Sequence, residues 1–591
     1  MAHKETEIEK SVHGGVFRRL MSYAKPYTIN FIFALVLVLI ITVLELYRPK
    51  LMGKAIDLFV DGKPFSAIME TAALYFAVLI GSFICNITQT WVLQLTGQNI
   101  IYNIRQEVFE HIHKLSLRFF DITPVGRIVT RVTNDVEALN EMYANILVKL
   151  IKNAAKIIGL AVMMLRMDVK VALFAFILLP LIAALTILFK WVSRTTYRIT
   201  RTKITAINTY LSEHISGMKL IQIFAREKEK NKEFHHNNLD LFKANYREMM
   251  VFAVFRPSIY MLSVIALIII IAVGGDEVLR GVISIGTLYT FIQYINSFFE
   301  PIQELAEQFG TLQSAIASAE KIFTVLDEKS AIVNPENPVH VDKVKGRIEF
   351  EHVWFAYQGE DWILKDVSFV IEPGQKVAFV GATGAGKSSI LNLIGRYYDI
   401  AKGRILIDGI DIREMDTDEL RGAIGQVQQD VFVFTGDIKS NIRLKNENIT
   451  DEEVVEAARY VNADSFIEKL ENAYNEPVTE RGATLSAGQR QLLSFARTLA
   501  YDPAILVMDE ATANIDTETE SLIEEALDRL MKGRTTIMVA HRLSTIQHAD
   551  NIIVMHKGEV RESGTHQELL NNDGIYKKLY EIQLRSGGKD E

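Results

Sequence analysis

The sequence has little cysteine, proline or glycine for a chain of 591 residues. Cys85 is its only cysteine, which excludes an intrachain disulfide and a metal cluster held by several thiolates. With 12 prolines and 34 glycines, the chain also lacks the composition of collagen or of a low-complexity protein. The net charge of −8 gives no basic footprint for nucleic acid, so we predict no nucleic-acid partner.

What the chain does contain is long apolar runs, and these lie in its first half. A helix needs about 20 apolar residues to cross a hydrocarbon core of about 30 Å. Six segments reach or approach this length, at Thr28–Leu46, Met69–Leu93, Asn145–Leu165, Val169–Trp191, Val251–Val273 and Val282–Ile302. We therefore predict an all-α transmembrane domain of six helices. The first segment is too long for the apolar part of a signal peptide, so we expect it to be retained.

The charged residues predict how these helices are oriented. Lys and Arg are concentrated in the N-terminal tail and in the gaps 96–144 and 192–250, which predicts that both termini are cytoplasmic. Long stretches of the two gaps have helical periodicity, so the membrane helices are expected to continue far into the cytoplasm. The stretch GGVFRRLMSYAKPY before the first span predicts a short amphipathic helix on the membrane surface.

The composition changes at LDEKSAIVNPENPVHVDKVKG, where Pro335 and Pro338 lie among charged residues. We predict a linker there. The following residues alternate strand-like runs, such as GRIEFEHVWFAY and KVAFV, with helical runs. This alternation is typical of an α/β domain. The chain therefore combines a membrane half with a half that reads like a soluble protein.

Two motifs of the second half predict a nucleotide site. VAFVGATGAGKSSILNLI reads as a strand, a glycine-rich turn and a helix start, and Gly381, Gly386, Lys387 and Ser388 fit the P-loop pattern. Glycines at this spacing let backbone N–H groups converge on phosphate oxygens, the lysine neutralises the phosphates, and the hydroxyl offers a ligand to Mg²⁺. Further on, the apolar strand of PAILVMDEATANID ends in Asp509 and Glu510. At such a strand end, the aspartate can hold Mg²⁺ and the next carboxylate can polarise the attacking water.

Several further motifs resemble those of ATP-binding-cassette (ABC) exporters. TLSAGQRQLLSFARTL resembles the LSGGQ signature, and RFFDITPVGRIVTRVTNDV and EHISGMKLIQIFARE resemble the two intracellular loops. ERG at 480–482 is similar to the X-loop, and the resemblance covers nearly the whole chain. It implies these domains: tail and elbow helix 1–27, transmembrane domain 28–325, linker 326–345, ABC nucleotide-binding domain 346–585 and C-terminal tail 586–591.

The resemblance also implies roles for individual residues. Catalytic roles fall to Glu510, His541 and Gln429, the last two being the switch histidine and the Q-loop glutamine. The adenine-stacking ring would be Tyr357. The other nucleotide-binding residues would be Gly381, Thr383, Gly384, Ala385, Gly386, Lys387, Ser388, Ser389, Gln429 and Asp509. Of these, Ser388, Gln429 and Asp509 would bind Mg²⁺. The signature loop Ser486, Ala487, Gly488 and Gln489 would bind ATP held by another subunit, and Asp516 belongs to the D-loop.

In this family one signature loop does not serve its own P-loop, so the resemblance implies a dimer. It implies an ATPase that exports amphipathic drugs or lipids across the cell (inner) membrane. Short coupling helices are expected near Leu117–Ile122 and Tyr210–Gly217. Two departures from the pattern, Ala487 for Gly in the signature and Gln428 where many relatives have Pro, favour a heterodimer over a homodimer. A lipid, peptide or siderophore exporter and an ATP-gated channel or regulatory membrane protein remain alternatives.

Two polar stripes of the membrane half have two possible readings. Lys149, Lys152 and Lys156 share one face of the third predicted helix, and Gln293, Asn296, Glu300, Glu304 and Glu307 share one face of the sixth. Polar residues within a membrane segment face a bundle interior or water. We favour solvated helix extensions below the bilayer. The other reading is that the sixth-helix stripe lines the translocation cavity.

Overall fold

The computed structural model describes residues 15–587 apart from 342, 429–430, 510–516 and 540–545. The chain divides into two compact units, one of residues 1–113 and 124–328 and the other of residues 114–123 and 329–591. The first unit is helical. Its main helices are α2 (Thr28–Val60), α3 (Phe65–His113), α5 (Val125–Thr130), α6 (Val136–Glu141), α7 (Leu147–Met167), α8 (Val169–Phe176), α9 (Leu179–Ser216), α10 (Met218–Ile223), α11 (Glu227–Leu279) and α12 (Ile285–Leu326).

Each of the six predicted membrane segments falls on one or two of these helices. Within the described residues, four helical stretches are long and apolar enough to cross a membrane: Gly15–Val60, Phe65–His113, Val169–Ser216 and Glu227–Leu279. Helices α7 and α12 occupy the other two segments, but their polar residues lower their hydropathy. The 49 residues of α3 and 53 of α11 far exceed the 20 that a bilayer needs.

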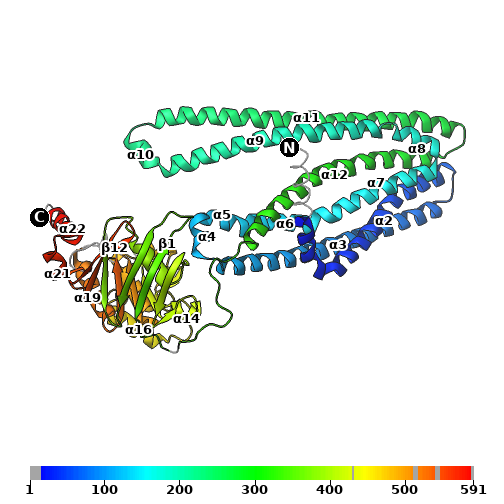
Figure 1. The fold of residues 1–591 in the computed structure, drawn as a ribbon. Helices are drawn as coiled ribbons and strands as arrows, with labels where there is room; N and C mark the ends of the chain where they lie inside the picture. The colour runs from blue at the N-terminus through cyan, green and yellow to red at the C-terminus, as the bar shows by residue number, and fades with distance from the viewer. Residues whose placement is uncertain (1–14, 342, 429–430, 510–516, 540–545, 588–591) are drawn as a thin grey trace. The chain divides into compact units, whose positions relative to one another are not determined.

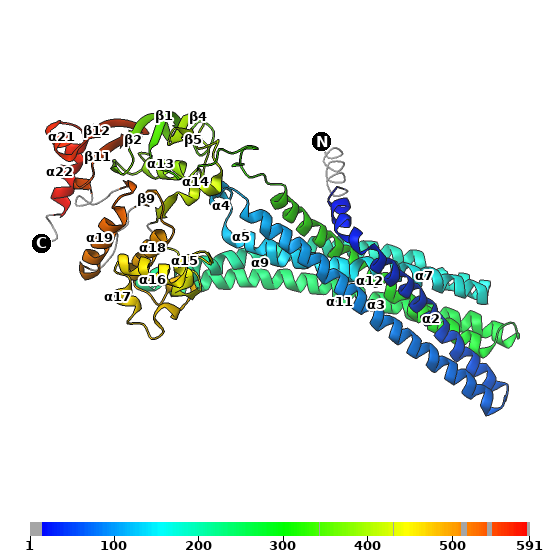
Figure 2. The ribbon, with the colours of Figure 1, turned by 90° about the horizontal axis from the view of Figure 1, so that it is seen from below.

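Helices α9 and α11 lie side by side over most of their length, as both views show (Figures 1 and 2). Helices α2, α3, α7 and α12 pack against one another, and α8 packs against α7 and α11. The core of this helical unit contains Met164, Phe255, Phe291, Tyr294 and Phe298, all buried. Two single π-helical turns, η2 (Arg131–Asp135) and η3 (Met142–Ile146), interrupt the helical segment before α7.

One prediction for this half of the chain needs correction. The first expected coupling helix is α4 (Leu117–Ile122), as predicted. The second is not a separate helix at Tyr210–Gly217, because α9 continues to Ser216 and Gly217 is its C-cap; the short helix that follows is α10. The two polar stripes contact each other, since Lys156 on α7 lies 3.5 Å from Glu300 on α12.

The second unit is an α/β domain with two main sheets. Strands β2 (Leu364–Ile371), β1 (Ile348–Phe355), β4 (Lys402–Ile407) and β5 (Ile410–Asp411) form an antiparallel sheet in that order. The other sheet has the order β12 (Glu559–Gly564), β11 (Asn551–His556), β3 (Lys376–Val380), β10 (Thr535–Val539), β9 (Ile505–Asp509) and β6 (Ile424–Val427). All of its pairs are parallel except β11–β12. Strands β7 (Gly436–Asp437) and β8 (Pro477–Val478) form a small ladder.

Helices pack on the second sheet and around it. They are α13 (Lys387–Ile394), α14 (Thr417–Gly422), α15 (Ile438–Arg443), α16 (Asp451–Tyr460), α17 (Asp464–Ile467), α18 (Ala487–Ala500), α19 (Thr517–Met531), α21 (His566–Asn571) and α22 (Ile575–Gly587). Two hydrophobic clusters form the core. One joins β1, β2 and α13, and the other joins α15, α16, α18 and α19.

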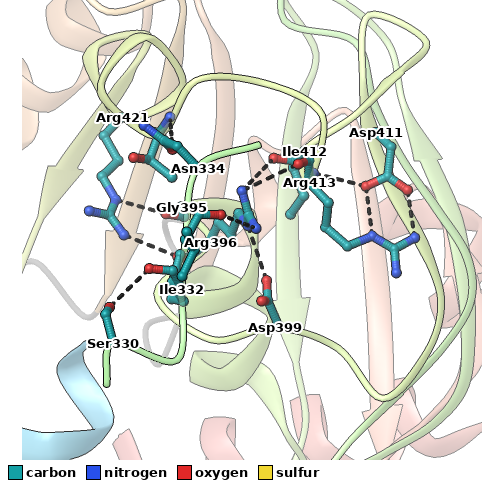
Figure 3. Close-up of polar contacts among 12 residues, drawn as sticks. Ser330, Ile332, Asn334, Gly395, Arg396, Asp399, Asp411, Ile412, Arg413 and Arg421 are labelled. Atoms are coloured by element: carbon teal, nitrogen blue, oxygen red, sulfur yellow. Dashed lines mark hydrogen bonds and ion pairs between the residues drawn. The ribbon is translucent and has the colours of Figure 1, made fainter. Parts of the chain in front are cut away.

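The predicted linker lies against this α/β domain rather than standing apart from it. The buried guanidinium of Arg396 donates to Val333 O at 3.3 Å and to Asp399 Oδ1 at 3.1 Å (Figure 3). Asn334 donates to Asp416 Oδ2 at 2.8 Å and accepts from the backbone N–H of Thr417 at 3.0 Å. Residues 333 and 334 are therefore fixed to the domain by side-chain hydrogen bonds.

Candidate nucleotide site

The P-loop motif forms the connection between β3 and α13. Gly386 is the N-cap of α13 with φ +102°, and a Cβ there would lie 2.6 Å from Leu364 Cδ2 and 3.2 Å from Ile363 O. A Cβ at Gly381 would lie 2.2 Å from Met555 O. Glycine is thus required at both positions, because any side chain would collide with the neighbouring strands. The loop approaches the sheet as closely as a phosphate cradle requires.

Lys387 is the cation of this loop. It is buried, at 7 % exposure, and its Nζ donates to Gly381 O at 2.8 Å and to Ala382 O at 3.1 Å. The ammonium group therefore lies within the curve of the loop, at the N-terminus of α13, where the helix dipole also favours an anion. Exposed Thr383 and Gly384 and buried Ala385 complete the loop. The arrangement suits the phosphates of a nucleotide.

The strand-end acid lies at the same edge of the sheet as the P-loop. Strands β3 and β9 both run parallel to β10, which separates them, so their carboxyl ends point the same way. Asp509 ends β9, and α13 packs against β9 and β10. Ser388, exposed at the start of α13, supplies a hydroxyl. Hydroxyl and carboxylate oxygens are ligands that suit Mg²⁺, so these residues fit that ion.

Aromatic rings form one wall beside the P-loop helix. Tyr357 Oη lies 3.1 Å from Ser389 Oγ on α13, and the Tyr357 ring lies edge-on to Phe355 at 4.7 Å and to Tyr398 at 5.0 Å. The structure thus brings Tyr357 and Ser389 together, as expected if both serve one nucleotide.

Tyr398 is a residue that the sequence reasoning missed. It is buried, and its hydroxyl donates to the carboxylate of Asp121 on α4. Burial, followed by this hydrogen bond, raises the pKa of Tyr398. Helix α4 is therefore joined by a side-chain hydrogen bond to the aromatic group that contains Tyr357. No local signal shows this, because the partners are 277 positions apart.

The signature motif begins a different helix, α18. Ser486 is its N-cap: the Ser486 hydroxyl accepts from Gln489 N at 3.2 Å, and Gln489 Oε1 accepts from Ser486 N at 2.9 Å. Ala487 is exposed and Gly488 is buried. Ala487 has no positive φ, so the backbone there does not require glycine. The residues of α18 belong to a different hydrophobic cluster from those of α13.

Four predicted site residues, Gln429, Glu510, Asp516 and His541, lie outside the described residues. The neighbouring elements are described: Val427 ends β6, Asp509 ends β9 and Val539 ends β10. These three strands are adjacent and parallel.

Comparisons with known proteins agree with this architecture. The family model for the ABC transporter transmembrane region matches residues 31–302, and that for the ABC transporter matches residues 364–513. The probable multidrug resistance ABC transporter ATP-binding/permease protein YheH of Bacillus subtilis (strain 168) is 41% identical over 513 residues, which are 86% of this chain and 76% of that protein.

A lipid transporter and a solved structure are also similar. The ATP-dependent lipid A-core flippase of Syntrophus aciditrophicus (strain SB) is 34% identical over 585 residues, covering 98% of this chain and 97% of the flippase. The structure of a bacterial Atm1-family ABC exporter with ATP bound aligns with a TM-score of 0.77 at 26% identity, over 94% of this chain and 98% of the exporter chain.

The predicted fold and family are thereby confirmed: a helical transmembrane domain precedes an α/β ATP-binding domain. The chain belongs to the ABC transporter family, as a multi-pass membrane protein of the multidrug and lipid exporter type that couples ATP hydrolysis to transport.

Proposed function

We propose that two ABC subunits form a dimeric exporter in which each ATP is bound between the P-loop of one subunit and the signature loop of the other. The observation that carries this proposal is that α13 and α18, whose N-termini are proposed to bind phosphate, belong to separate hydrophobic clusters of one domain. Each helix start has N–H groups that no acceptor within the helix can satisfy. Each is thus suited to phosphate, and a second subunit would unite them.

The signature loop has donors left for a phosphate. Ser486 uses its hydroxyl oxygen to accept from Gln489 N, which leaves the hydroxyl proton able to donate. The backbone N–H groups of Ala487 and Gly488 lie in the first turn of α18, ahead of the one that Ser486 caps. Their partner on the other subunit would be the phosphates held at Lys387.

Nucleotide binding at the P-loop begins with an exchange of partners at Lys387. Its Nζ would leave Gly381 O and Ala382 O for phosphate oxygens, which accept more strongly because they are charged. Tyr357 would stack on the adenine. Ser388, Asp509 and Gln429 would hold Mg²⁺, which supplies positive charge against the phosphates when bound. Glu510 would orient or deprotonate the attacking water, while His541 and Gln429 would sense the γ-phosphate.

Closure of the two ATPase domains would be transmitted through short helices. The hydrogen bond from Tyr398 to Asp121 attaches α4 to the α/β domain of its own chain, and α10 is proposed as the second coupling helix.

The protein is proposed to lie in the cell (inner) membrane, with its ATPase domain and both termini in the cytoplasm and with the domain boundaries expected from the sequence. The substrate is proposed to be an amphipathic drug or lipid, which the names of the relatives support.

The partner is proposed to be a second, non-identical half-transporter. Ala487 carries a Cβ where the LSGGQ pattern has glycine, at an exposed position on the loop that would approach the other subunit's phosphates. Purifying this chain alone tests the point. Drug-stimulated ATPase from the lone chain would indicate a homodimer.

The variant Glu510→Gln tests the whole proposal in the purified, reconstituted protein. We expect ATP binding to remain and turnover to fall by about 10²–10⁴, the usual worth of a general base. Glu447→Gln, an exposed acid of the same domain, is the control and should leave turnover unchanged. Retained hydrolysis by the Glu510→Gln transporter, with no unsubstituted copy of this chain present, would reject the role of Glu510. Substrate flux into vesicles without hydrolysis would favour an ATP-gated channel over a pump.

A further inference from the structure

A cavity of about 580 Å³ lies between α2, α7 and α12 in the transmembrane unit. Its lining carries three carboxylates, Glu45 on α2 and Glu300 and Glu304 on α12. Asn153 on α7 donates to Glu304 Oε2 at 2.8 Å. The two polar stripes seen in the sequence thus face each other across a space inside the helical bundle.

The same cavity contains four basic side chains, and two of them are paired with acids. Lys152 Nζ lies 3.3 Å from Glu45 Oε1, and Lys156 Nζ lies 3.8 Å from Glu45 Oε2 and 3.5 Å from Glu300 Oε2. The two lysines and Glu45 are each no more than about one-quarter exposed. These contacts neutralise much of the charge on this wall.

Arg48 and Lys149 are the two remaining cations of the cavity. Neither has an acidic partner within the part of the chain that the structure describes. Arg48 Nε is buried without a hydrogen-bond acceptor, and the guanidinium carbon lies 5.8 Å from the ring centre of Tyr75. Among the described residues, the lining therefore has four basic groups against three acidic ones, and Arg48 and Lys149 are the two cations without an acidic partner there.

A buried cation is costly unless a counter-ion accompanies it, and the Nε of Arg48 is buried. The carboxylates of the lining are engaged by Lys152, Lys156 and Asn153. An anion entering the cavity would supply the missing charge and an acceptor for Arg48 Nε. The charge balance of the cavity thus favours a negatively charged ligand over a cationic one.

A second hollow adjoins the first, and its lining combines apolar side chains with polar ones, among them Ser82, Asn86, Thr90 and Gln94. It has a volume of about 740 Å³, shares Glu45 and Arg48 with the charged cavity, and runs along α3. Its side along α3 includes Leu79, Phe83, Ile87 and Trp91. These residues recur every four positions, so they lie on one helix face, and the last three are 55–66 % exposed. They form an apolar strip about 18 Å long that starts beside the charged groups.

We propose that these two connected hollows bind an anionic amphipathic substrate, with its phosphate or carboxylate group between Arg48 and Lys149 and its apolar tail along the strip on α3. This assignment rests on the proposed export function and narrows its substrate class. Neutral and cationic amphipaths would lack the charge that completes the cavity.

The test measures binding without nucleotide, so that it does not depend on hydrolysis. The full chain is placed in nanodiscs of zwitterionic phosphatidylcholine, and four probes with the same 12-carbon tail are compared: dodecyl phosphate, dodecanoate, dodecyl maltoside and dodecyltrimethylammonium. We expect the two anions to bind at least tenfold more tightly than the cation. Inorganic phosphate alone should bind much more weakly than dodecyl phosphate, because the apolar strip contributes. Equal or tighter binding of the cation would overturn the proposal.

Variants locate the two ends of the probe. Lys149→Glu, at an exposed position, should reverse the preference toward dodecyltrimethylammonium. Arg48→Gln should weaken dodecyl phosphate about tenfold, whereas Lys50→Gln, an exposed cation on the same helix outside the cavity, should change neither binding nor basal ATPase. A tail-brominated dodecyl phosphate should quench tryptophan fluorescence, and Trp91→Phe should remove most of that quenching.

The outcomes separate this inference from the proposed function. An unchanged anion preference in Lys149→Glu would show that the headgroup does not lie in the cavity and would reject the inference even if transport is normal. Absence of ATP hydrolysis would count against the proposed export function, while the binding preference would still decide the charge of the ligand.

Discussion

The hydrogen bond between Tyr398 and Asp121 predicts how the ATPase domain and the first coupling helix communicate. Tyr398→Phe removes only the hydroxyl and keeps the ring that lies 5.0 Å from Tyr357. A hydrogen bond to a charged group contributes about 1.5–3 kcal/mol, but Asp121 is exposed, so we take about 1–1.5 kcal/mol. For a domain of this size, that corresponds to a fall in apparent Tm of about 2–6 °C.

The functional assay compares substrate-stimulated with basal ATPase in reconstituted protein. We expect the ratio of substrate-stimulated to basal ATPase to fall toward one in Tyr398→Phe, because α4 would lose its hydrogen bond to the α/β domain. Tyr397→Phe is the matched control: the adjacent ring packs against the Arg421 guanidinium at 5.0 Å, and removing its hydroxyl should leave the ratio intact. Asp121→Asn, combined with Tyr398→Phe, completes a double-mutant cycle. Equal ratios in the two tyrosine variants, or additive effects in the cycle, would refute the reasoning.

The same hydrogen bond predicts a flat pH dependence. Burial and the bond to Asp121 raise the pKa of Tyr398 above its ordinary value, which is about 10. For a group whose folded-state pKa is raised, the stabilisation is fully present below the unfolded-state pKa and is lost only as the pH rises through the folded-state pKa. The difference in Tm between the parent and Tyr398→Phe should therefore stay constant from about pH 7 to 9. A difference that disappears within that range would contradict this assignment.

Three further predictions concern other parts of the chain. Gly384→Ala should cost about 1–2 kcal/mol of stability from its left-handed backbone alone, since nothing lies within 4 Å of the added Cβ. Gly386→Ala should cost about 1 kcal/mol more, because its added Cβ also meets Leu364. Thermal unfolding of both variants measures the difference. Glu45→Gln should destabilise the chain by about 1–3 kcal/mol, because it leaves Lys152 without its carboxylate; an unchanged Tm would argue against a structural ion pair. Ala487→Gly should raise ATPase turnover of the assembled transporter if the Cβ crowds the phosphate, and equal turnover would show that it does not.

Local patterns were enough to predict much of the fold. The glycine-rich turn between a strand and a helix was correctly predicted, because glycine, lysine and serine spacing is a local property. A short helix near Leu117–Ile122, expected from the resemblance to the first intracellular loop of the family, is also present, as α4. The second coupling helix was misplaced because Gly217 was taken as its end, whereas the chain bends there and α10 begins one residue later.

Contacts between distant segments could not be predicted in this way. The ion pair between Lys156 and Glu300 joins residues 144 positions apart, and each helix considered alone presents only a polar face. A polar face on one helix looks the same whether water or another helix covers it. Tyr398 was missed for the same reason, because nothing in its neighbourhood indicates a bond to Asp121.

The length of α11 has a mechanical consequence. Its 53 residues correspond to a rod of about 80 Å, of which a bilayer core accounts for about 30 Å. If the rod pivots at the membrane surface, a tilt of about 5° moves its far end by about 4 Å, roughly three-quarters of the rise of one helical turn. Helix rotations too small to disturb the packing of the apolar segments would thus move α10 by about the length of a side chain. The long helices act as levers, and their stiffness determines how much of a movement at one end is transmitted to the other end.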